Sequence, residues 1–295
     1  MSSPSLPSPA LLPIQLLALD LDGTLVRDNL TIDSKVHSLL HNIQAKGTIK
    51  VVVATGRMHP SAKIYADKLG ITQPIISYQG SMVCAQDVGQ TRLHHQPISF
   101  DMAERLWAFL DTEKFHTNTY IENQLYTHAT NPFLDLYRSL SGLEPNLINN
   151  WQDVPLALRQ QGPTKLMVID EERMPQLIGG LKEHFGDAIT YFMSRSNFCE
   201  IIAPNVSKWS AVWWLAQQWN IPQHAIMCCG DQENDAAMIE AAGIGVAMGN
   251  APDHIKALAN VIAPHVDDAG LTPLLSQLLD TGTITLPEGR VRRGG

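Results

Sequence analysis

Short apolar runs that alternate with helical patterns constrain the fold of this chain more than any other feature. The segments IQLLAL (14–19), IKVVVATGR (49–57) and PIISYQG (74–80) each contain a nearly continuous apolar run. Such runs are typical of parallel strands that are covered on both faces. Between them, apolar residues recur at helical spacing after Asp33 and across residues 60–69. This βαβαβ order predicts an α/β fold with a doubly wound, Rossmann-like parallel sheet.

A second kind of pattern occupies residues 86–197. Its strands, such as HTNTYIEN and TKLMVID, are shorter and more polar, and helical patterns lie near 99–115, 131–140 and 172–185. Buried strands then return in the segments FCEIIAP, HAIMCCGD and GIGVAMG, with a helix over 208–219 between the first two. We therefore expect a separate α+β domain that is inserted into the parallel-sheet domain.

These patterns divide the chain into two expected domains with flexible ends. The first residues are rich in serine and proline, which is typical of a leader outside the folded core. The expected boundaries are 1–13 for the leader, 14–85 and 198–280 for a discontinuous core, 86–197 for the inserted domain, and 281–295 for a flexible tail.

The overall composition is that of a globular protein with a substantial core. Of the 295 residues, 44% are hydrophobic and 17% are charged, and the net charge is −8. This acidic balance gives no reason to expect nucleic acid or an anionic membrane as a partner. The N-terminus lacks the basic residues of a targeting signal. We therefore expect a cytoplasmic monomer or small homo-oligomer whose four cysteines are reduced thiols.

Polar side chains follow several of the predicted strands at the point where each strand ends. In an open α/β sheet, ligands bind at the carboxyl ends of the strands, so a functional site is expected there. The candidate residues are Asp20, Asp22, Thr55, Gly56, Asp231, Asn234 and Asp235, together with Lys208 at the start of a late helix.

The candidate acids Asp20, Asp22 and Asp231 lie at the ends of two strands that this topology can bring together. Three carboxylates at one place repel one another unless a cation lies between them, and oxygen ligands favour a hard ion such as Mg²⁺. An EF-hand loop that begins at Asp20 would need a glutamate where the chain has Thr31, which excludes that calcium site. Acids that serve only in turns remain the alternative.

Thr55 and Lys208 are candidate ligands of a phosphate group. A hydroxyl and a glycine amide at a strand end can hold one phosphate oxygen, and an ammonium at a helix start can neutralise another. Alone, a Thr-Gly turn or a single lysine is more typical of an ordinary surface. Asp231 and Asp235 are four residues apart and would share one face of a helix. Helix capping by Asp231 is the other interpretation of that acid.

Four segments in this order resemble the motifs of the haloacid dehalogenase superfamily: DLDGTLV, ATGR, VSKWSA and GDQENDAAMIEAAGIGVAMGNA. The large insertion between the second and third segments is similar to that of the Cof-type phosphatases of this superfamily. The resemblance covers residues 14–85 and 198–275. It implies a phosphoric monoester hydrolase whose inserted domain is a cap that closes over the phosphate site.

The resemblance also implies roles for the acids. Asp20 would be the nucleophile that attacks phosphorus and forms an aspartyl-phosphate. Asp22 would protonate the leaving alcohol and then act as the base for the hydrolytic water. Mg²⁺ would be bound by Asp20, by the backbone carbonyl of Asp22 and by Asp231.

The remaining candidates would act on the phosphate. Thr55 and Lys208 would hold the transferring phosphoryl group, with Gly56 and Asn234 beside it. Asp235 would orient Lys208 or a water molecule on the metal. This set offers the positioning and charge neutralisation that phosphoryl transfer needs.

The substrate is less constrained than the reaction. The family commonly has Asn-Gly-Ala where this chain has Gln79-Gly80-Ser81, in the loop that leads into the insertion. A small phosphorylated metabolite such as a sugar phosphate is expected. The alternatives are a phosphomutase of the same superfamily and a non-catalytic phospho-acceptor or ligand-binding protein. Within the insertion, the polar candidates for substrate recognition are Arg138, Lys165, Arg195 and Asn197.

Overall fold

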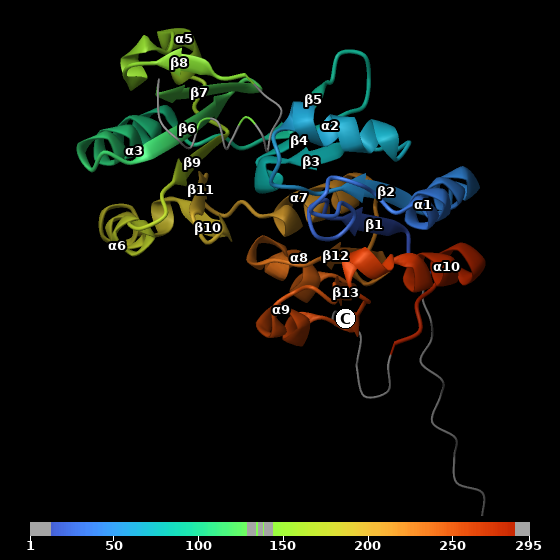
Figure 1. Ribbon diagram of the computed structural model, residues 1–295. Helices are drawn as coiled ribbons and strands as arrows, with labels where there is room; N and C mark the ends of the chain where they lie inside the picture. Colours follow the sequence, from blue (N-terminus) through green and yellow to red (C-terminus); the bar gives the residue numbers. More distant parts are fainter. Residues whose placement is uncertain (1–12, 129–133, 135–137, 139–143, 287–295) are drawn as a thin grey trace, which may run out of the picture. The chain divides into compact units, whose positions relative to one another are not determined.

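The computed structural model describes residues 13–128, 134, 138 and 144–286 (Figure 1). Nearly all of the expected leader, most of the helix expected near 131–140 and the end of the expected tail lie outside the described residues. The chain forms two compact units. The first contains residues 13–51, 215–231 and 238–286, and the second contains the described part of 52–214 together with 232–237. The division expected from the sequence, with a domain over 86–197, stays a prediction.

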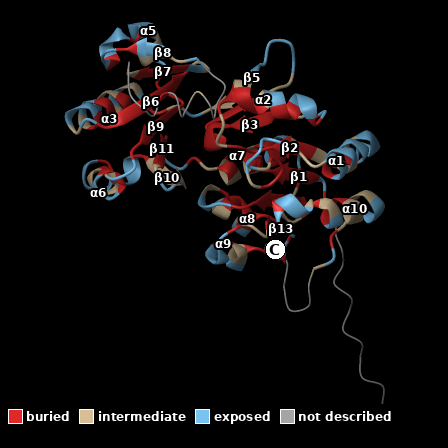
Figure 2. Ribbon diagram, in the orientation of Figure 1, coloured by how far each residue is buried: buried red, intermediate tan, exposed pale blue. Residues whose placement is uncertain are grey.

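A five-stranded sheet has the strand order β14-β13-β12-β1-β2, and its strands β1, β12, β13 and β14 run parallel. The strands are β1 (Leu16–Leu19), β2 (Lys50–Val53), β12 (Ile226–Gly230), β13 (Ile244–Ala247) and β14 (Val261–Ile262). Nearly all of their residues are buried (Figure 2). This sheet confirms the α/β fold with a parallel core that the apolar runs predict.

The first helix begins and ends at the residues that the sequence indicates. The Asp33 carboxylate accepts hydrogen bonds from two backbone N–H groups in the first turn of α1 (Ser34–Lys46). The helix ends at Gly47, whose φ of 71° is a left-handed conformation that favours glycine. Helix α1 packs beside α10 (Thr272–Thr281), and α9 (Asp253–Leu258) follows β13 (Figure 1).

Two other predicted helices are also present. Helix α2 (His59–Lys68) confirms the helix expected over 60–69, and α7 (Lys208–Gln218) confirms the helix expected over 208–219. Helix α8 (Ala236–Ala241) directly follows the segment GDQEND. The predicted candidates Lys208 and Asp235 therefore lie at or beside the starts of helices.

A second sheet has six strands in the order β10-β11-β9-β6-β7-β8 and is antiparallel except for the β7–β8 pair. Helices α3 (Phe100–Thr112) and α6 (Met174–His184) confirm those expected near 99–115 and 172–185, and the short helix α5 (Leu156–Arg159) precedes β9. The segment FCEIIAP is buried as expected, but it forms β11 of this antiparallel sheet. The strands are β6 (His116–Ile121), β7 (Gln124–His128), β8 (Asn146–Ile148), β9 (Lys165–Ile169), β10 (Thr190–Arg195) and β11 (Phe198–Ile202).

Both faces of this second sheet contribute to apolar clusters. One cluster joins the sheet to α3 and α6 through residues such as Leu106 and Leu177. The other contains Tyr120 of β6 together with Tyr78. Because both faces are covered, even polar residues of β6 such as Asn118 are buried. The polar pattern of this segment therefore does not mark a solvent-exposed strand.

The segment PIISYQG forms a strand as predicted, but its pairing differs from the expected parallel order. It contributes β3 (Ile75–Ser77) to a three-stranded antiparallel sheet with β4 (Met82–Cys84) and β5 (Arg92–His95). Its parallel contact with the strand before it is a single bridge between Ala54 and Ile76. The reason is the tight turn over Tyr78–Gly80, which reverses the chain and pairs β3 with the segment that follows.

The cysteines are free and buried, as the expectation of reduced thiols requires. Burial raises the pKa of the Cys84 thiol to about 11 and that of the Cys199 thiol to about 12. Both thiols therefore stay protonated at neutral pH, and a protonated thiol is a poor nucleophile.

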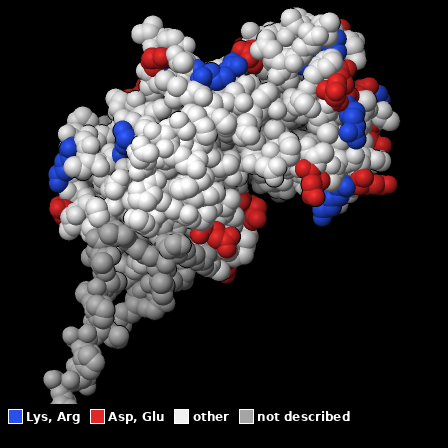
Figure 3. All heavy atoms as spheres, turned by 180° about the vertical axis from the view of Figure 1, so that it is seen from behind, with Lys and Arg blue, Asp and Glu red and all other residues white. Residues whose placement is uncertain are grey.

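On the face in Figure 3, lysines and arginines lie in small groups that are separated by acidic and uncharged residues. Within the described part of the chain, no helix combines the length and apolar character needed to cross a bilayer. The expectation that neither nucleic acid nor a membrane is a partner stays a prediction.

Candidate active site

The first unit places Asp20 and Asp231 at the carboxyl ends of two neighbouring strands. Strands β1 and β12 pair in parallel with Leu19 opposite Cys229, and the Asp20 N–H donates to the Cys229 carbonyl at 3.0 Å. Both carboxyl residues are buried, with 4% of Asp20 and 3% of Asp231 exposed. Because a buried carboxylate is costly without compensating charge or hydrogen bonds, this pair indicates a functional site.

Side chains from two loops hold the Asp231 carboxylate. Asn250 Nδ2 donates to Asp231 Oδ2 at 3.0 Å and to the Gly23 carbonyl at 2.8 Å, and Thr24 Oγ1 lies 3.5 Å from Asp231 Oδ1. Neither Asn250 nor Thr24 was among the site residues predicted from the sequence. The signal for Asn250 was its place just after β13, at the sheet edge where polar residues were expected to gather.

Gly23 lies directly against the Asp231 carboxylate. A Cβ at Gly23 would be 2.2 Å from Asp231 Oδ2, and the φ of 77° is left-handed. We expect Gly23→Ala to lower the free energy of unfolding by about 1–3 kcal/mol, because overlap with Asp231 adds to backbone strain. Chemical denaturation measures this change.

Gly47→Ala is the matched control for that substitution. Its φ of 71° is similar, but no atom lies within 4 Å of its added Cβ, so it carries only the backbone strain. A Gly23→Ala variant that loses no more stability than Gly47→Ala would show that Gly23 does not support Asp231.

Asp22 is exposed, in contrast to its neighbour Asp20. It lies on the loop after β1 and forms an isolated parallel bridge with Val26. An exposed carboxyl close in sequence to a buried one is suited to exchanging protons with a ligand or with water.

The second unit contains a buried ion pair between Lys208 and Asp235. Lys208 Nζ lies 2.6 Å from Asp235 Oδ1, and the two side chains are 1% and 0% exposed. Asp235 Oδ2 accepts the backbone N–H of Gln232 at 3.1 Å, so both of its oxygens are engaged. Gln232 is the N-cap of the short 3₁₀ helix over Glu233–Asp235. Helix capping by Asp231 is therefore wrong, since the cap is the next residue.

Thr55 and Gly56 form the turn after β2, also in the second unit. Thr55 is buried, and its Oγ1 accepts the backbone N–H of Arg57 at 3.2 Å. The Gly56 carbonyl accepts a hydrogen bond from Lys165 Nζ at 2.9 Å. A turn with this many fixed polar groups can present a hydroxyl to an anionic ligand.

Asn234 is half-buried and begins a chain of hydrogen bonds in the second unit. Its Nδ2 donates to Gln79 Oε1 at 3.0 Å, and Gln79 Nε2 donates to Glu200 Oε2 at 3.2 Å. Glu200 Oε2 also accepts from Lys165 Nζ at 2.9 Å. Lys165 was a candidate for substrate recognition, but its side chain is only 3% exposed and is already paired.

Of the other recognition candidates, Arg138 forms an ion pair with Glu144 at 3.1 Å. Asn197 is half-buried, and the side chain of Arg195 lies outside what the structure describes. Recognition of a substrate by these three residues stays a prediction.

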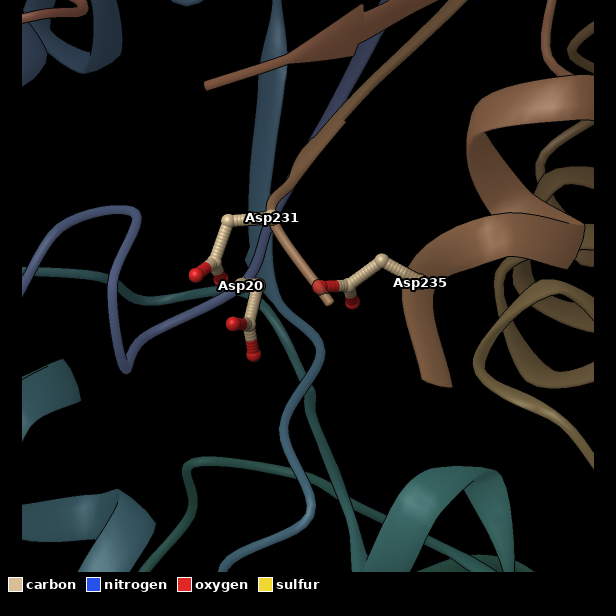
Figure 4. Close-up of side chains that lie close together, drawn as sticks. All are labelled: Asp20, Asp231 and Asp235. Carbon is tan, nitrogen blue, oxygen red and sulfur yellow. The ribbon is translucent and has the colours of Figure 1, made fainter. Parts of the chain in front are cut away.

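Asp20 and Asp231 bring two carboxylates together in the first unit (Figure 4). Each offers an oxygen, and these two oxygens lie within 4.8 Å of each other. Both residues are buried. A buried set of carboxylate oxygens fits a hard divalent cation such as Mg²⁺, which would offset their mutual repulsion.

Comparison with known proteins identifies the family. Residues 17–275 match the haloacid dehalogenase-like hydrolases, so the chain belongs to this family. The parallel-sheet fold and the strand-end acids agree with that assignment, and the fold and family predicted from the motifs are confirmed.

The relatives of this chain include named phosphatases. Phosphatase YwpJ of Bacillus subtilis (strain 168) is 30% identical over 290 residues, which cover 90% of this chain and 100% of YwpJ. The 5-amino-6-(5-phospho-D-ribitylamino)uracil phosphatase YitU of the same organism is 26% identical over 267 residues, with coverage of 89% and 96%. The crystal structure of TM0651 from Thermotoga maritima matches with a TM-score of 0.78 and 28% identity, covering 90% of this chain and 97% of TM0651. The chain is thus a phosphoric monoester hydrolase.

Proposed function

We propose that this protein is a Mg²⁺-dependent phosphatase that hydrolyses a small phosphorylated metabolite, such as a sugar phosphate or a similar phosphomonoester. The observation that carries the proposal is the pair of buried acids Asp20 and Asp231 at neighbouring strand ends, with the exposed Asp22 two residues after the first. This arrangement supplies a nucleophile, a proton donor and an acidic metal ligand within one sheet edge.

In the proposed reaction, Asp20 attacks phosphorus and the bond from phosphorus to the leaving alcohol breaks. Asp22 gives its proton to the alcohol oxygen as that bond breaks. A water molecule then attacks the aspartyl-phosphate, and Asp22 takes a proton from it. Inorganic phosphate leaves, and the Asp20 carboxylate and the Asp22 acid are restored.

The phosphoryl oxygens would be bound by Thr55, the Gly56 amide, Lys208 and Asn234. The ion pair with Asp235 supports this role of Lys208, because it holds the ammonium in one place. These groups do little covalent chemistry. They orient the phosphoryl group and offset the negative charge of the transition state.

Mg²⁺ would be held by the carboxylates of Asp20 and Asp231 and by the backbone carbonyl of Asp22. When bound, the cation would neutralise charge on the phosphoryl group and on the acids. The hydrogen bond from Asn250 to Asp231 Oδ2 supports the assignment, because it orients that carboxylate.

The substrate class is proposed from a named relative. YitU is named for a phosphorylated ribitylamino uracil, which is a small phosphomonoester. We propose that this chain also takes a small cytoplasmic phosphomonoester, and that residues 86–197 form the cap that recognises its leaving group.

Release of inorganic phosphate tests the proposal. We expect release from some members of a panel of sugar phosphates, nucleotides and an aryl phosphate in the presence of Mg²⁺, and loss of that release with a chelator. Product analysis by phosphorus NMR separates the alternatives. An isomerised phosphate ester with little free phosphate would indicate a phosphomutase, and a stable phosphoprotein without release would indicate a phospho-acceptor.

A further inference from the structure

A chain of hydrogen-bonded polar side chains joins two proposed phosphate contacts within the second unit. It runs from Asn234 through Gln79 and Glu200 to Lys165, and ends on the carbonyl of Gly56. Gln79, Glu200 and Lys165 are 2%, 4% and 2% exposed. We define these three residues as the buried relay.

The two charged groups of the buried relay, Lys165 and Glu200, form an ion pair with each other. Lys165 Nζ lies 2.9 Å from Glu200 Oε2 and 2.9 Å from the Gly56 carbonyl oxygen, and Tyr120 offers its ring face 4.8 Å away. The same carboxylate oxygen of Glu200 accepts from the Gln79 amide. Burying an ion pair costs desolvation that attraction alone often does not recover, so its presence here calls for a functional reason.

Gln79 sits in a backbone conformation that this relay must support. Tyr78 and Gln79 have φ values of 51° and 61°, which are uncommon for residues other than glycine. Gly80 follows with φ of 102°, and a Cβ there would be 2.1 Å from the Ser207 carbonyl oxygen. Strain of this kind persists only where surrounding contacts hold it, and it is concentrated at functional sites.

The relay touches the Gly56 turn at two points. Lys165 binds the Gly56 carbonyl, and the Gln79 amide lies so close that a Cβ at Gly56 would be 2.1 Å from Gln79 Nε2. Glycine at position 56 is therefore what allows the amide to approach the turn.

The contact with Lys165 sets the direction of the Thr55 hydroxyl. The Gly56 carbonyl and the Arg57 N–H belong to one planar peptide and point in opposite directions. Holding the carbonyl on Lys165 thus directs the Arg57 N–H, which donates to Thr55 Oγ1 at 3.2 Å. A threonine hydroxyl has one hydrogen, so with a lone pair engaged its O–H is aimed elsewhere and can donate to an anion.

We propose that Lys165, Glu200 and Gln79 are positioning residues that hold the Thr55 turn and Asn234 in the geometry that binds the phosphoryl group. This inference rests on the proposed phosphatase function. It assigns no contact with the leaving group to Lys165. Loss of the buried relay should therefore lower kcat/KM by the same factor for every phosphomonoester.

The test compares Lys165→Met with the parent enzyme on the ester panel. We expect kcat/KM to fall about a hundredfold by the same factor for every ester, because a displaced phosphate turn is common to all. We also expect inhibition by inorganic phosphate to weaken. The double variant Lys165→Met/Glu200→Met removes both buried charges, so it should be at least as stable as the single variant. Its kcat/KM should fall by the same factor.

Arg159→Met is the matched control. It removes a cation that lies 2.7 Å from a carboxylate oxygen of Glu104 in the same unit. We expect its kcat/KM and its phosphate inhibition to equal those of the parent.

Two results would overturn the inference. Loss factors that differ by more than about tenfold between esters would mean that Lys165 contacts the leaving group. A lower kcat with unchanged phosphate inhibition in both Lys165 variants would mean that the relay serves only stability. If the parent releases no phosphate at all, the proposed function fails. Calorimetric binding of inorganic phosphate with Mg²⁺ then tests whether Lys165, Glu200 and Gln79 position the phosphate-binding turn. Equal binding by parent and variant, or no binding by the parent, would overturn this positioning role.

Discussion

Asp20→Asn is expected to lower kcat by at least about a thousandfold, because an amide cannot form the acyl-phosphate bond on which the reaction depends. The fold should survive the change. Asn has nearly the shape of Asp, and the backbone hydrogen bond from residue 20 to Cys229 does not use the side chain. Replacing one of the two neighbouring buried carboxylates, Asp20 and Asp231, also reduces their repulsion, so the thermal midpoint without metal should be equal or higher.

Steady-state phosphate release and thermal unfolding of the same preparations check this expectation. Asp28→Asn is the control, because it makes the same chemical change at an exposed acid of the following loop. Near-parent turnover by folded Asp20→Asn protein would exclude Asp20 as the nucleophile and would leave Asp22 or Asp231 to be tested in that role.

Lys208→Met is expected to impair both stability and turnover. The substitution leaves the Asp235 carboxylate buried without its cation, which costs about 3–5 kcal/mol in comparable buried pairs. The two side chains are 1% and 0% exposed, so solvent cannot replace the lost charge. Urea denaturation at neutral pH measures the change in the free energy of unfolding.

A second substitution separates the two effects. Lys208→Met/Asp235→Asn removes the stranded charge, while the amide side chain introduced at position 235 still offers an acceptor to the Gln232 N–H, so stability should largely return. Turnover should stay low, because no ammonium remains to bind the phosphoryl group. A double variant that regained parent turnover would show that Lys208 supports the fold only.

Much of the architecture was predictable because its causes are local. Apolar runs with glycine or polar punctuation mark parallel strands wherever they occur, and Asp33 and Gly47 carry the capping chemistry of α1 within their own turns. The placement of Asp20 and Asp231 followed from one further rule, that parallel strands share a carboxyl edge. The pairing of β3 was not predicted, because the tight turn after this strand favours antiparallel pairing with the next strand, β4.

The hydrogen-bond partners of the site residues could not be predicted from these local rules. Asn250 and Asp231 are 19 residues apart, and Gln79 and Glu200 are 121 apart. Whether two such groups meet depends on how helices and sheets pack. No local pattern of residues encodes those distances.

Lys165 illustrates the difference most clearly. In the sequence it is a polar residue before an apolar run. That pattern is equally compatible with a side chain in solvent, against a substrate or in an ion pair. The strand itself follows from the local residues KLMVI, because a short apolar run of this kind favours an extended strand. The antiparallel pairing of β9 with β11 determines the contacts and the burial of Lys165. It brings the β9 lysine beside Glu200 of β11 and buries both, so electrostatic compensation between distant strands, and not propensity, determined what this residue contacts.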